Sequence, residues 1–348
     1  MKDRLPLIGI TMGDPTGIGP EIAAKALSSP EIYRICRPMV VGDAKVMHQA
    51  SKIARAGLKI NPIKEVELGK YEYGTLDVYD LENVDIERLA YKKVTRMGGK
   101  SSLDYIYEAI DLAMAKKIDA TVTGPIHKEA IRLGGCPYPG HTEVFAHRTQ
   151  TEDYAMMLVE GKFRVVHVTT HVALKHVSSL IRKDRVLKVI KLAHRAMKDL
   201  GIENPRIIVP GFNPHASDGG LFGDEEEKEI FPAVQTAKEE GINVEGPIPP
   251  DTAFVKLRSG QYDVALAMYH DQGHIPLKLL GFSWDRESGQ WESISGVNVT
   301  LGLPVIRTSV DHGVAYGKAG EGRASPDSLI QAIKLAAQLA QSKKSPRT

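Results

Sequence analysis

Short runs of apolar and β-branched residues alternate along the chain with longer segments in which apolar residues recur at helical spacing. The first two such runs, residues 7–11 and 39–41, flank a helical segment at 19–27. Pro20 and Glu21 are typical of a helix start, because a first-turn proline loses no hydrogen bond and an acidic residue complements the helix dipole. Alternation from the first residues onward predicts an α/β protein.

The same pattern continues through the chain and predicts further elements. Strands are expected at residues 119–123, 163–169, 206–209 and 262–268, and helices at 102–116, 182–200, 224–239 and 326–339. One polar segment, 283–295, interrupts the rhythm and contains a Ser288-Gly289 turn signal, so we expect a surface hairpin there. A glycine, proline or histidine cluster follows each of these predicted strands, which makes strand ends the first place to look for chemistry.

Length and composition narrow the range of functions. A chain of 348 residues is long enough for two domains. A net charge of +2 is too small for the broad positive field of a nucleic-acid or membrane-surface protein, so the expected partner is a small molecule. No apolar run approaches the ~20 residues of a membrane span, and we expect a cytoplasmic protein. Cys36 and Cys136 form no paired motif, so neither a disulfide framework nor a thiolate metal site is indicated.

Three histidines stand beside turn or acidic residues after predicted strands: His171 in VTTHV, His215 in NPHASDGG and His270 in MYHDQGH. Three neutral imidazoles leave an open position on a divalent ion, and loops at strand ends can meet in one crevice. Any single histidine is more often an ordinary surface or core residue, so convergence of the three is a hypothesis. His167 also lies four residues before His171, but its β-branched neighbours predict a strand, and no glutamate follows it as in a zinc-protease helix.

Two carboxylates are available to support such a metal site. Asp271 follows His270 directly, and Asp251 ends the PIPPD segment. Either could orient a ligand or bind the ion itself. For Asp251 the preceding prolines favour a helix cap or a turn equally well.

Two glycine-rich turns are candidates for cofactor binding. Gly13, Asp14 and Gly17 lie in MGDPTGIGPE, between the first predicted strand and helix, where glycine allows close backbone approach and a helix start favours an anion. Packing explains this turn as readily as binding does. Gly219 and Gly220 lie in the acidic stretch DGGLFGDEE, where contact with a ribose or adenine is more natural than contact with phosphate.

Residues suited to an anionic substrate lie near these loops: His141, Thr142, Lys278, Asn298 and Arg307. An arginine can bind carboxylate or phosphate with two parallel hydrogen bonds, whereas a lysine supplies a point charge. Taken one at a time, each is as easily a surface residue.

Several long motifs occur together and in order: ITMGDPTGIGPEI, TGPIHKEAI, PGHTE, NPHASDGG with GDEE, AMYHDQGHIPLK and GVNVTLGLPVIRTSVDHG. Over residues 7 to 340 the chain resembles the 4-hydroxythreonine-4-phosphate dehydrogenase family. The resemblance implies a two-domain α/β/α fold like that of isocitrate and isopropylmalate dehydrogenases. We expect one domain from residues 1–127 and 302–348 and a second from 128–301.

The resemblance also implies roles for the candidate residues. His171, His215 and His270 fall on the family's metal ligands, and His141, Thr142, Lys278, Asn298 and Arg307 on its substrate contacts. The family is a homodimer whose active site takes one ligand histidine from the partner, here His270. The wider decarboxylating dehydrogenases have an HGxA…AG loop near the adenine that resembles 312–320, which adds Asp311, His312 and Gly313 as cofactor candidates, although Val314 and Tyr316 depart from that pattern.

The function implied is NAD- and metal-dependent oxidative decarboxylation of a 4-phosphorylated 3-hydroxy acid. NADP is an alternative cofactor, and the metal ion is zinc, cobalt, manganese, nickel or magnesium. The wording GHIPLKLLGF favours the sugar-acid branch, which acts on 4-phospho-D-threonate or 4-phospho-D-erythronate and gives dihydroxyacetone phosphate and carbon dioxide. The alternative is 4-phosphohydroxy-L-threonine in pyridoxal phosphate biosynthesis. From other classes, a three-histidine zinc hydrolase and a non-catalytic phosphometabolite-binding protein remain as hypotheses.

Overall fold

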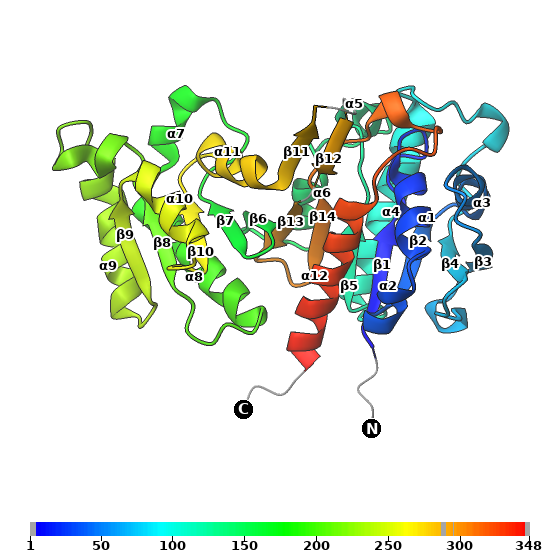
Figure 1. The fold of residues 1–348 in the computed structure, drawn as a ribbon, viewed down its shortest axis with the longest axis horizontal. Coiled ribbons are helices and arrows are strands. Elements are labelled where there is room, and N and C mark those ends of the chain that lie inside the picture. Colours follow the sequence, from blue (N-terminus) through cyan, green and yellow to red (C-terminus); the bar gives the residue numbers. More distant parts are fainter. Residues whose placement is uncertain (1–4, 287–289, 295, 345–348) are drawn as a thin grey trace. The chain divides into compact units, whose positions relative to one another are not determined.

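A computed structural model describes residues 5–286, 290–294 and 296–344. Its internal contacts divide the chain into two compact units, one made of Met1–Glu152 with Leu303–Thr348 and one of Asp153–Gly302. Each unit contains a sheet with helices packed on it, as Figure 1 shows. The expected α/β class is therefore confirmed.

The sheet of the first unit is parallel throughout its described strands, in the order β3-β4-β2-β1-β5-β14. Every residue of β1 (Leu7–Thr11) and of β5 (Ala120–Thr123) is buried, as expected for central parallel strands covered on both faces. The remaining strands are β2 (Arg37–Gly42), β3 (Lys59–Ile63), β4 (Thr75–Asp80) and β14 (Arg307–Val310).

Helices of the first unit pack on this sheet and on one another. The long α4 (Arg96–Met114) contacts β1, β2 and β5, and α12 (Asp327–Lys344) contacts β14 and β5. The other helices are α1 (Gly19–Leu27), α2 (Pro30–Ile35), α3 (Ala44–Ile53), α5 (Lys128–Leu133) and α6 (His141–Arg148).

The second unit has a mixed sheet in the order β13-β6-β7-β10-β8-β9. Strands β7 (Phe163–His167), β10 (Val264–Ala267), β8 (Ile207–Pro210) and β9 (Val244–Ile248) are parallel, while β6 (Ala155–Glu160) and β13 (Val297–Leu301) complete an antiparallel edge. The helices are α7 (Leu174–Leu180), α8 (Lys183–Asp199), α9 (Phe231–Glu239), α10 (Pro250–Arg258) and α11 (His270–Gly281).

The division between the units differs from the expected one at residues 127 and 128, because residues 128–152 pack with the first unit. Helix α5 lies so close to α4 that a side chain at Gly99 would collide with the backbone oxygen of Ala130. Arg148, at the end of α6, makes two hydrogen bonds of 3.0 and 2.7 Å to the Asp111 carboxylate of α4. These contacts attach both short helices to α4.

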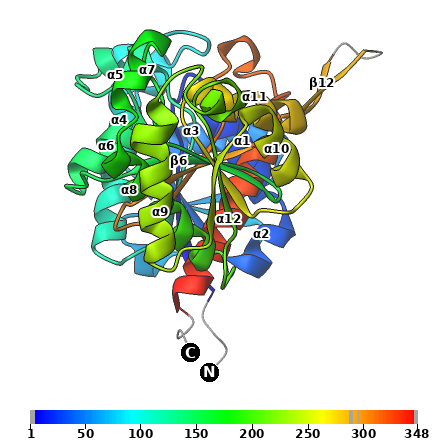
Figure 2. The ribbon, with the colours of Figure 1, turned by 90° about the vertical axis from the view of Figure 1, so that its left-hand side faces the viewer.

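The hairpin predicted in the polar segment is present. Strand β11 (Phe282–Asp285) pairs antiparallel with β12 (Gln290–Ile294), and Figure 2 shows this pair projecting away from the rest of its unit. The predicted Ser288-Gly289 turn lies outside the described residues. A two-stranded pair of this kind is only marginally stable by itself in water.

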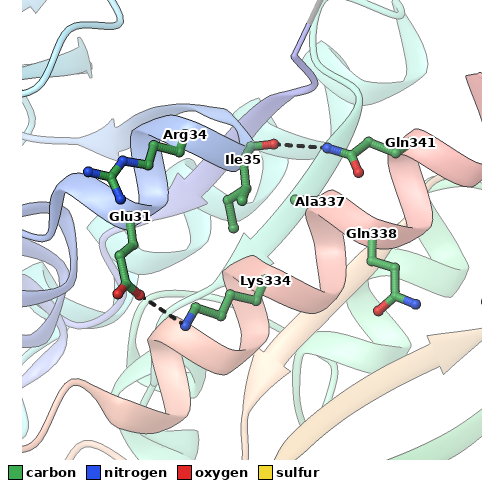
Figure 3. Close-up of a pocket in the computed structure, with 7 residues that line it drawn as sticks. All are labelled: Glu31, Arg34, Ile35, Lys334, Ala337, Gln338 and Gln341. Carbon is green, nitrogen blue, oxygen red and sulfur yellow. Dashed lines mark hydrogen bonds and ion pairs between the residues drawn. The ribbon is translucent and has the colours of Figure 1, made fainter.

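A shallow groove of about 450 Å³ runs between α2 and α12 (Figure 3). An ion pair of 3.4 Å joins Glu31 to Lys334 across it, and the side chain of Gln341 donates to the backbone oxygen of Ile35 at 3.1 Å. None of the residues predicted for metal, substrate or cofactor lines this groove. Among the described helices, none combines the length and apolar character needed to cross a bilayer.

Candidate active site

The three predicted ligand histidines all belong to the second unit and follow three of its parallel strands. His171 comes after β7, His270 after β10 and His215 after β8. These strands are adjacent in the order β7-β10-β8, so their carboxyl ends lie at the same edge of the sheet. Loops at such an edge are where α/β proteins place ligands.

The chemistry of His270 fits a metal ligand. Its ring nitrogen Nδ1 lies 2.7 Å from the Asp271 carboxylate, and a hydrogen bond donated there leaves Nε2 available to a metal ion. Ligand histidines commonly have such a carboxylate partner, which fixes the tautomer and the ring orientation. The ring of His171 lies 5.6 Å from that of His270, centroid to centroid, within the same chain. No group of three His, Cys, Asp or Glu side chains in the described part of one chain is arranged to hold a metal ion.

His215 lies in a strained turn. It is the first of four consecutive non-glycine residues in the left-handed region, with φ values of 54° at His215, 55° at Ala216, 67° at Ser217 and 48° at Asp218. Each costs roughly 1–2 kcal/mol relative to ordinary backbone, and such strain is usually found at functional sites. Buried Glu226 holds the start of this turn, because its carboxylate accepts hydrogen bonds of 2.7 Å from the backbone N–H groups of Phe212 and Asn213.

We expect replacement of Ala216 by glycine to stabilise the protein. Glycine adopts φ 55° without the steric cost of a Cβ atom. Removal of this cost outweighs the extra conformational freedom of glycine in the unfolded chain, so the free energy of unfolding should rise by about 0.5–1 kcal/mol. Thermal unfolding, followed by calorimetry, measures the change. The matched control is Ala115→Gly, at φ −74°, which should be neutral or destabilising. A melting temperature for A216G at or below that of the parent protein would contradict the strain at this turn.

A buried glutamine connects two of the histidine-bearing loops. Gln272 accepts a 2.6 Å hydrogen bond from the backbone N–H of Met268, at the end of β10, and donates a 2.7 Å hydrogen bond to the backbone oxygen of Gly211, after β8. The His270 segment and the His215 segment are thereby joined by one side chain. Gln272 is not among the predicted site residues, although it stands between two histidines in HDQGH.

A column of histidine rings lies behind His270. The ring of His274 stacks on that of His270 with centroids 3.6 Å apart and an angle of 13°, and the ring of His167 lies 4.7 Å from His274. Burial lowers the pKa of His274 to about 4 and that of His167 to about 3, with the neighbouring histidines acting in the same direction. Both rings are therefore neutral near pH 7. The structure also places His167 in β7, which confirms the predicted strand and excludes a metal-binding helix at this point.

In the first unit, Arg307 lies beside two other predicted substrate residues, Thr142 and His141. It begins β14 and is 3% exposed, and its side chain reaches Thr123, the last residue of β5, at 2.9 Å and Thr142 of α6 at 3.4 Å. Burial lowers the pKa of Arg307 only to about 10, so its guanidinium group is charged at neutral pH. A desolvated arginine of this kind binds phosphate or carboxylate strongly.

His141 lies beside this arginine at the start of α6. Burial and the charge of Arg307 lower its pKa well below the usual value, so the imidazole is neutral. Its Nε2 atom is buried and has no hydrogen-bond partner among the described residues. His141 therefore offers a substrate a directed hydrogen bond and no second positive charge.

Lys278 and Asn298, the other two predicted substrate residues, belong to the second unit. Lys278 lies on α11 with its Nζ atom 5.6 Å from the centre of the Phe282 ring. Asn298 lies on β13, and its buried Oδ1 atom has no hydrogen-bond partner among the described residues. A substrate could satisfy that oxygen with a hydroxyl or amino donor.

The predicted cofactor residues of the first unit fall on two loops that contact each other. The backbone N–H of Ile18 donates to the backbone oxygen of Val314 at 3.0 Å, and the Tyr316 hydroxyl donates to buried Asp14 at 2.9 Å. A side chain at Gly17 would collide with Val314. The glycine-rich turn and the 311–318 loop are thus packed together, with Asp14 engaged by Thr16 and Tyr316 as an internal tie.

The remaining candidates have simpler surroundings. Gly13 takes a left-handed conformation with φ 75°, and Gly219 and Gly220 continue the strained turn with φ 69° and 92°. Asp251 is exposed in the first turn of α10, which agrees with its interpretation as a helix-start residue. The His312 ring contacts the backbone oxygen of Gly313 at 3.0 Å, and the backbone N–H of Asp311 donates to Ser328 at 3.3 Å.

The chain is similar to known proteins over nearly its full length. A family model described as pyridoxal phosphate biosynthetic protein PdxA matches residues 34–336. D-threonate 4-phosphate dehydrogenase of Cupriavidus necator is 44% identical over 341 residues, covering 98% of this chain and 99% of that protein. A 4-hydroxythreonine-4-phosphate dehydrogenase of Desulforapulum autotrophicum is 46% identical over 338 residues, covering 97% and 96%. The crystal structure of 4-hydroxythreonine-4-phosphate dehydrogenase from Klebsiella pneumoniae superimposes with a TM-score of 0.85 at 40% identity, covering 97% and 100%.

Proposed function

We propose that this chain, which belongs to the pyridoxal phosphate biosynthetic protein PdxA family, oxidises and decarboxylates a 4-phosphorylated 3-hydroxy acid with NAD and a divalent metal ion. It is a dehydrogenase of the decarboxylating kind, and the family implies NAD(P) and a metal. The zinc-hydrolase and binding-protein alternatives lose their basis, because the curated relatives are dehydrogenases. The observation that carries the proposal is the placement of His171, His215 and His270 after three adjacent parallel strands.

These three histidines are the proposed metal ligands, with Asp271 orienting His270. When bound, the metal supplies a Lewis acid for the oxygen at position 3 of the substrate. Arg307 and Thr142 bind an anionic end of the substrate, and neutral His141 donates or accepts one hydrogen bond there. Lys278 and Asn298 complete the proposed set of substrate contacts.

The proposed reaction is an oxidation followed by loss of carbon dioxide. A hydride leaves carbon 3 for NAD⁺ while the hydroxyl proton is released, and the resulting ketone lies β to the carboxylate. The bond between carbons 1 and 2 then breaks, and carbon 2 takes up a proton. With 4-phospho-D-threonate or 4-phospho-D-erythronate, the products are dihydroxyacetone phosphate, carbon dioxide and NADH.

We favour the sugar acid over 4-phosphohydroxy-L-threonine as substrate. The Cupriavidus necator relative is named D-threonate 4-phosphate dehydrogenase. The names of other relatives at 43–46% identity also contain D-threonate 4-phosphate. One relative of equal similarity, from Desulforapulum autotrophicum, is named for 4-hydroxythreonine 4-phosphate. The phosphate and the carboxylate are common to both substrates, so the choice depends on the group at carbon 2.

We further propose a homodimer in which His270 of the partner subunit completes the metal site. Two observations support it. Within one chain, no described group of three such side chains is arranged to hold a metal ion. The second unit also presents large apolar side chains that are more than half exposed, and exposed apolar surface of this kind often marks a protein interface; they are Leu174, Leu221, Val255, Ile275 and Leu279.

The test is an assay of purified protein with NAD or NADP, one divalent metal at a time, and each candidate phosphate. We expect reduction of the cofactor, with carbon dioxide released in equal amount, and a higher kcat/KM for 4-phospho-D-threonate than for 4-phosphohydroxy-L-threonine. Unphosphorylated D-threonate is the matched control and should react poorly. Absence of cofactor reduction with every candidate would refute the proposal, and release of inorganic phosphate without NAD would favour a hydrolase.

A further inference from the structure

We infer that His274 is a positioning residue that holds the ring of His270 in the orientation needed to bind the metal. This inference rests on the proposed function, in which His270 is a metal ligand. His274 is not proposed as a ligand and acts through the ring of His270, on which it stacks. Its ring covers one face of the His270 ring, and a hydrogen bond and the ring of His167 fix its own position.

The first contact is the stack itself. His270 and His274 lie four residues apart at the start of α11, which places both side chains on one face of the helix, one turn apart. Their rings are 3.6 Å apart and nearly parallel, at 13°. This contact covers one face of the His270 ring and limits its tilt.

The second contact fixes the ring of His274. Nδ1 of His274 lies 2.9 Å from the backbone oxygen of His270 and donates a hydrogen bond to it. His274 is 7% exposed, so few other positions are open to its ring. The ring of His274 is therefore held by a hydrogen bond to the backbone of His270, the residue on whose ring it stacks.

The third contact is made by His167, the last ring of the column. The His167 ring packs against His274 at 4.7 Å, and the Nδ1 atom of His167 lies 3.3 Å from the backbone oxygen of Met156, on the neighbouring strand β6. Gly273 lets this ring approach, because a side chain at that position would collide with Nε2 of His167. The column thus connects His270 to the sheet.

Together with Asp271, the column leaves His270 with one free nitrogen. Asp271 takes up the Nδ1 edge of the ring and His274 covers one face, so Nε2 remains the atom presented to a ligand. Residues that orient a metal ligand commonly change metal affinity by about 10- to 100-fold when they are replaced. We expect His274 to act on this scale.

The test measures metal binding by the full-length dimer, separately from catalysis. His274→Leu removes both the aromatic face and the donor, and it should raise the dissociation constant for Co²⁺ or Zn²⁺ by about 10- to 100-fold, with a changed visible absorption spectrum for bound Co²⁺. His274→Phe retains an aromatic ring that can stack on His270, so its dissociation constant for the metal should stay within about threefold of the parent value. His194→Leu, in α8 of the same unit, is the matched control.

Each outcome has a definite meaning. A parent protein that binds no metal would refute the proposed function. A parent protein that binds metal while H274L matches it in affinity and Co²⁺ spectrum would overturn the inference and leave the proposed function intact. Equal losses in H274L and H274F would also overturn it, because the ring face would then not be the property that matters. Thermal unfolding of each metal-free variant identifies any general loss of folding, which by itself would not alter the Co²⁺ spectrum of the folded fraction.

Discussion

A heterodimer that carries His215→Ala on one subunit and His270→Ala on the other should recover about half of the parent activity, whereas each homodimeric variant should have almost none. If a site takes His171 and His215 from one chain and His270 from its partner, the heterodimer contains one intact site and one site that lacks two ligands. Co-expression with two affinity tags yields the heterodimer, and NAD reduction measures its activity.

A second heterodimer gives the matched control for this experiment. His171→Ala and His215→Ala placed on different subunits would damage both sites, because these two ligands are proposed to come from the same chain. No recovery is expected. If neither heterodimer recovers activity, all three ligands come from one chain, and the shared-site proposal is wrong.

Replacement of Arg307 by methionine should lower kcat/KM by a factor of about 30 to 5,000. Removing one partner of a desolvated, hydrogen-bonded charge pair costs about 2–5 kcal/mol, which gives this range. Arg307 is buried between Thr123 and Thr142, so water cannot easily replace the guanidinium group. Steady-state kinetics with the phosphorylated substrate measures the loss, and most of it should lie in KM if the contact is equal in the ground and transition states.

Two further variants separate charge from geometry at this position. Arg307→Lys keeps a positive charge but cannot make two parallel hydrogen bonds, so it should recover only part of the loss. Thr142→Val keeps the arginine and removes one hydroxyl, and the expected decrease is smaller, about tenfold, as for one neutral hydrogen bond. A parent-like KM in R307M, with folding intact by circular dichroism, would show that Arg307 does not bind substrate.

The elements with strong local signals were predicted well. The bounds predicted for the first strand and the first helix agree with the structure residue for residue, and Pro20 with the glycines before it marks the turn between them. The helix expected from residue 102 begins instead at Arg96, where Thr95 caps it. Gly98 and Gly99 obscure this helix start in the sequence, because glycine disfavours helices. Gly99 is needed for close packing against α5, a contact that no local sequence pattern reveals.

For the candidate site, residue types and strand ends were predictable, but the contacts between them were not. The three histidines could be chosen because each follows a predicted strand. Gln272 bonds to Gly211, 61 residues earlier in the sequence, and Glu226 holds the His215 turn from a separate π-helical segment, so neither role has a local signal. For His274 a signal existed in its four-residue spacing from His270, but the segment was not assigned to a helix from sequence.

The amide of Gln272 has a consequence for how this fold can diverge. Because one side chain satisfies a donor after β10 and an acceptor after β8, neither loop can change length or direction without breaking a buried hydrogen bond of the other. The two loops therefore act as one structural unit, and we expect an insertion in either to be costly. The hairpin of β11 and β12 follows α11 and lies outside these two loops.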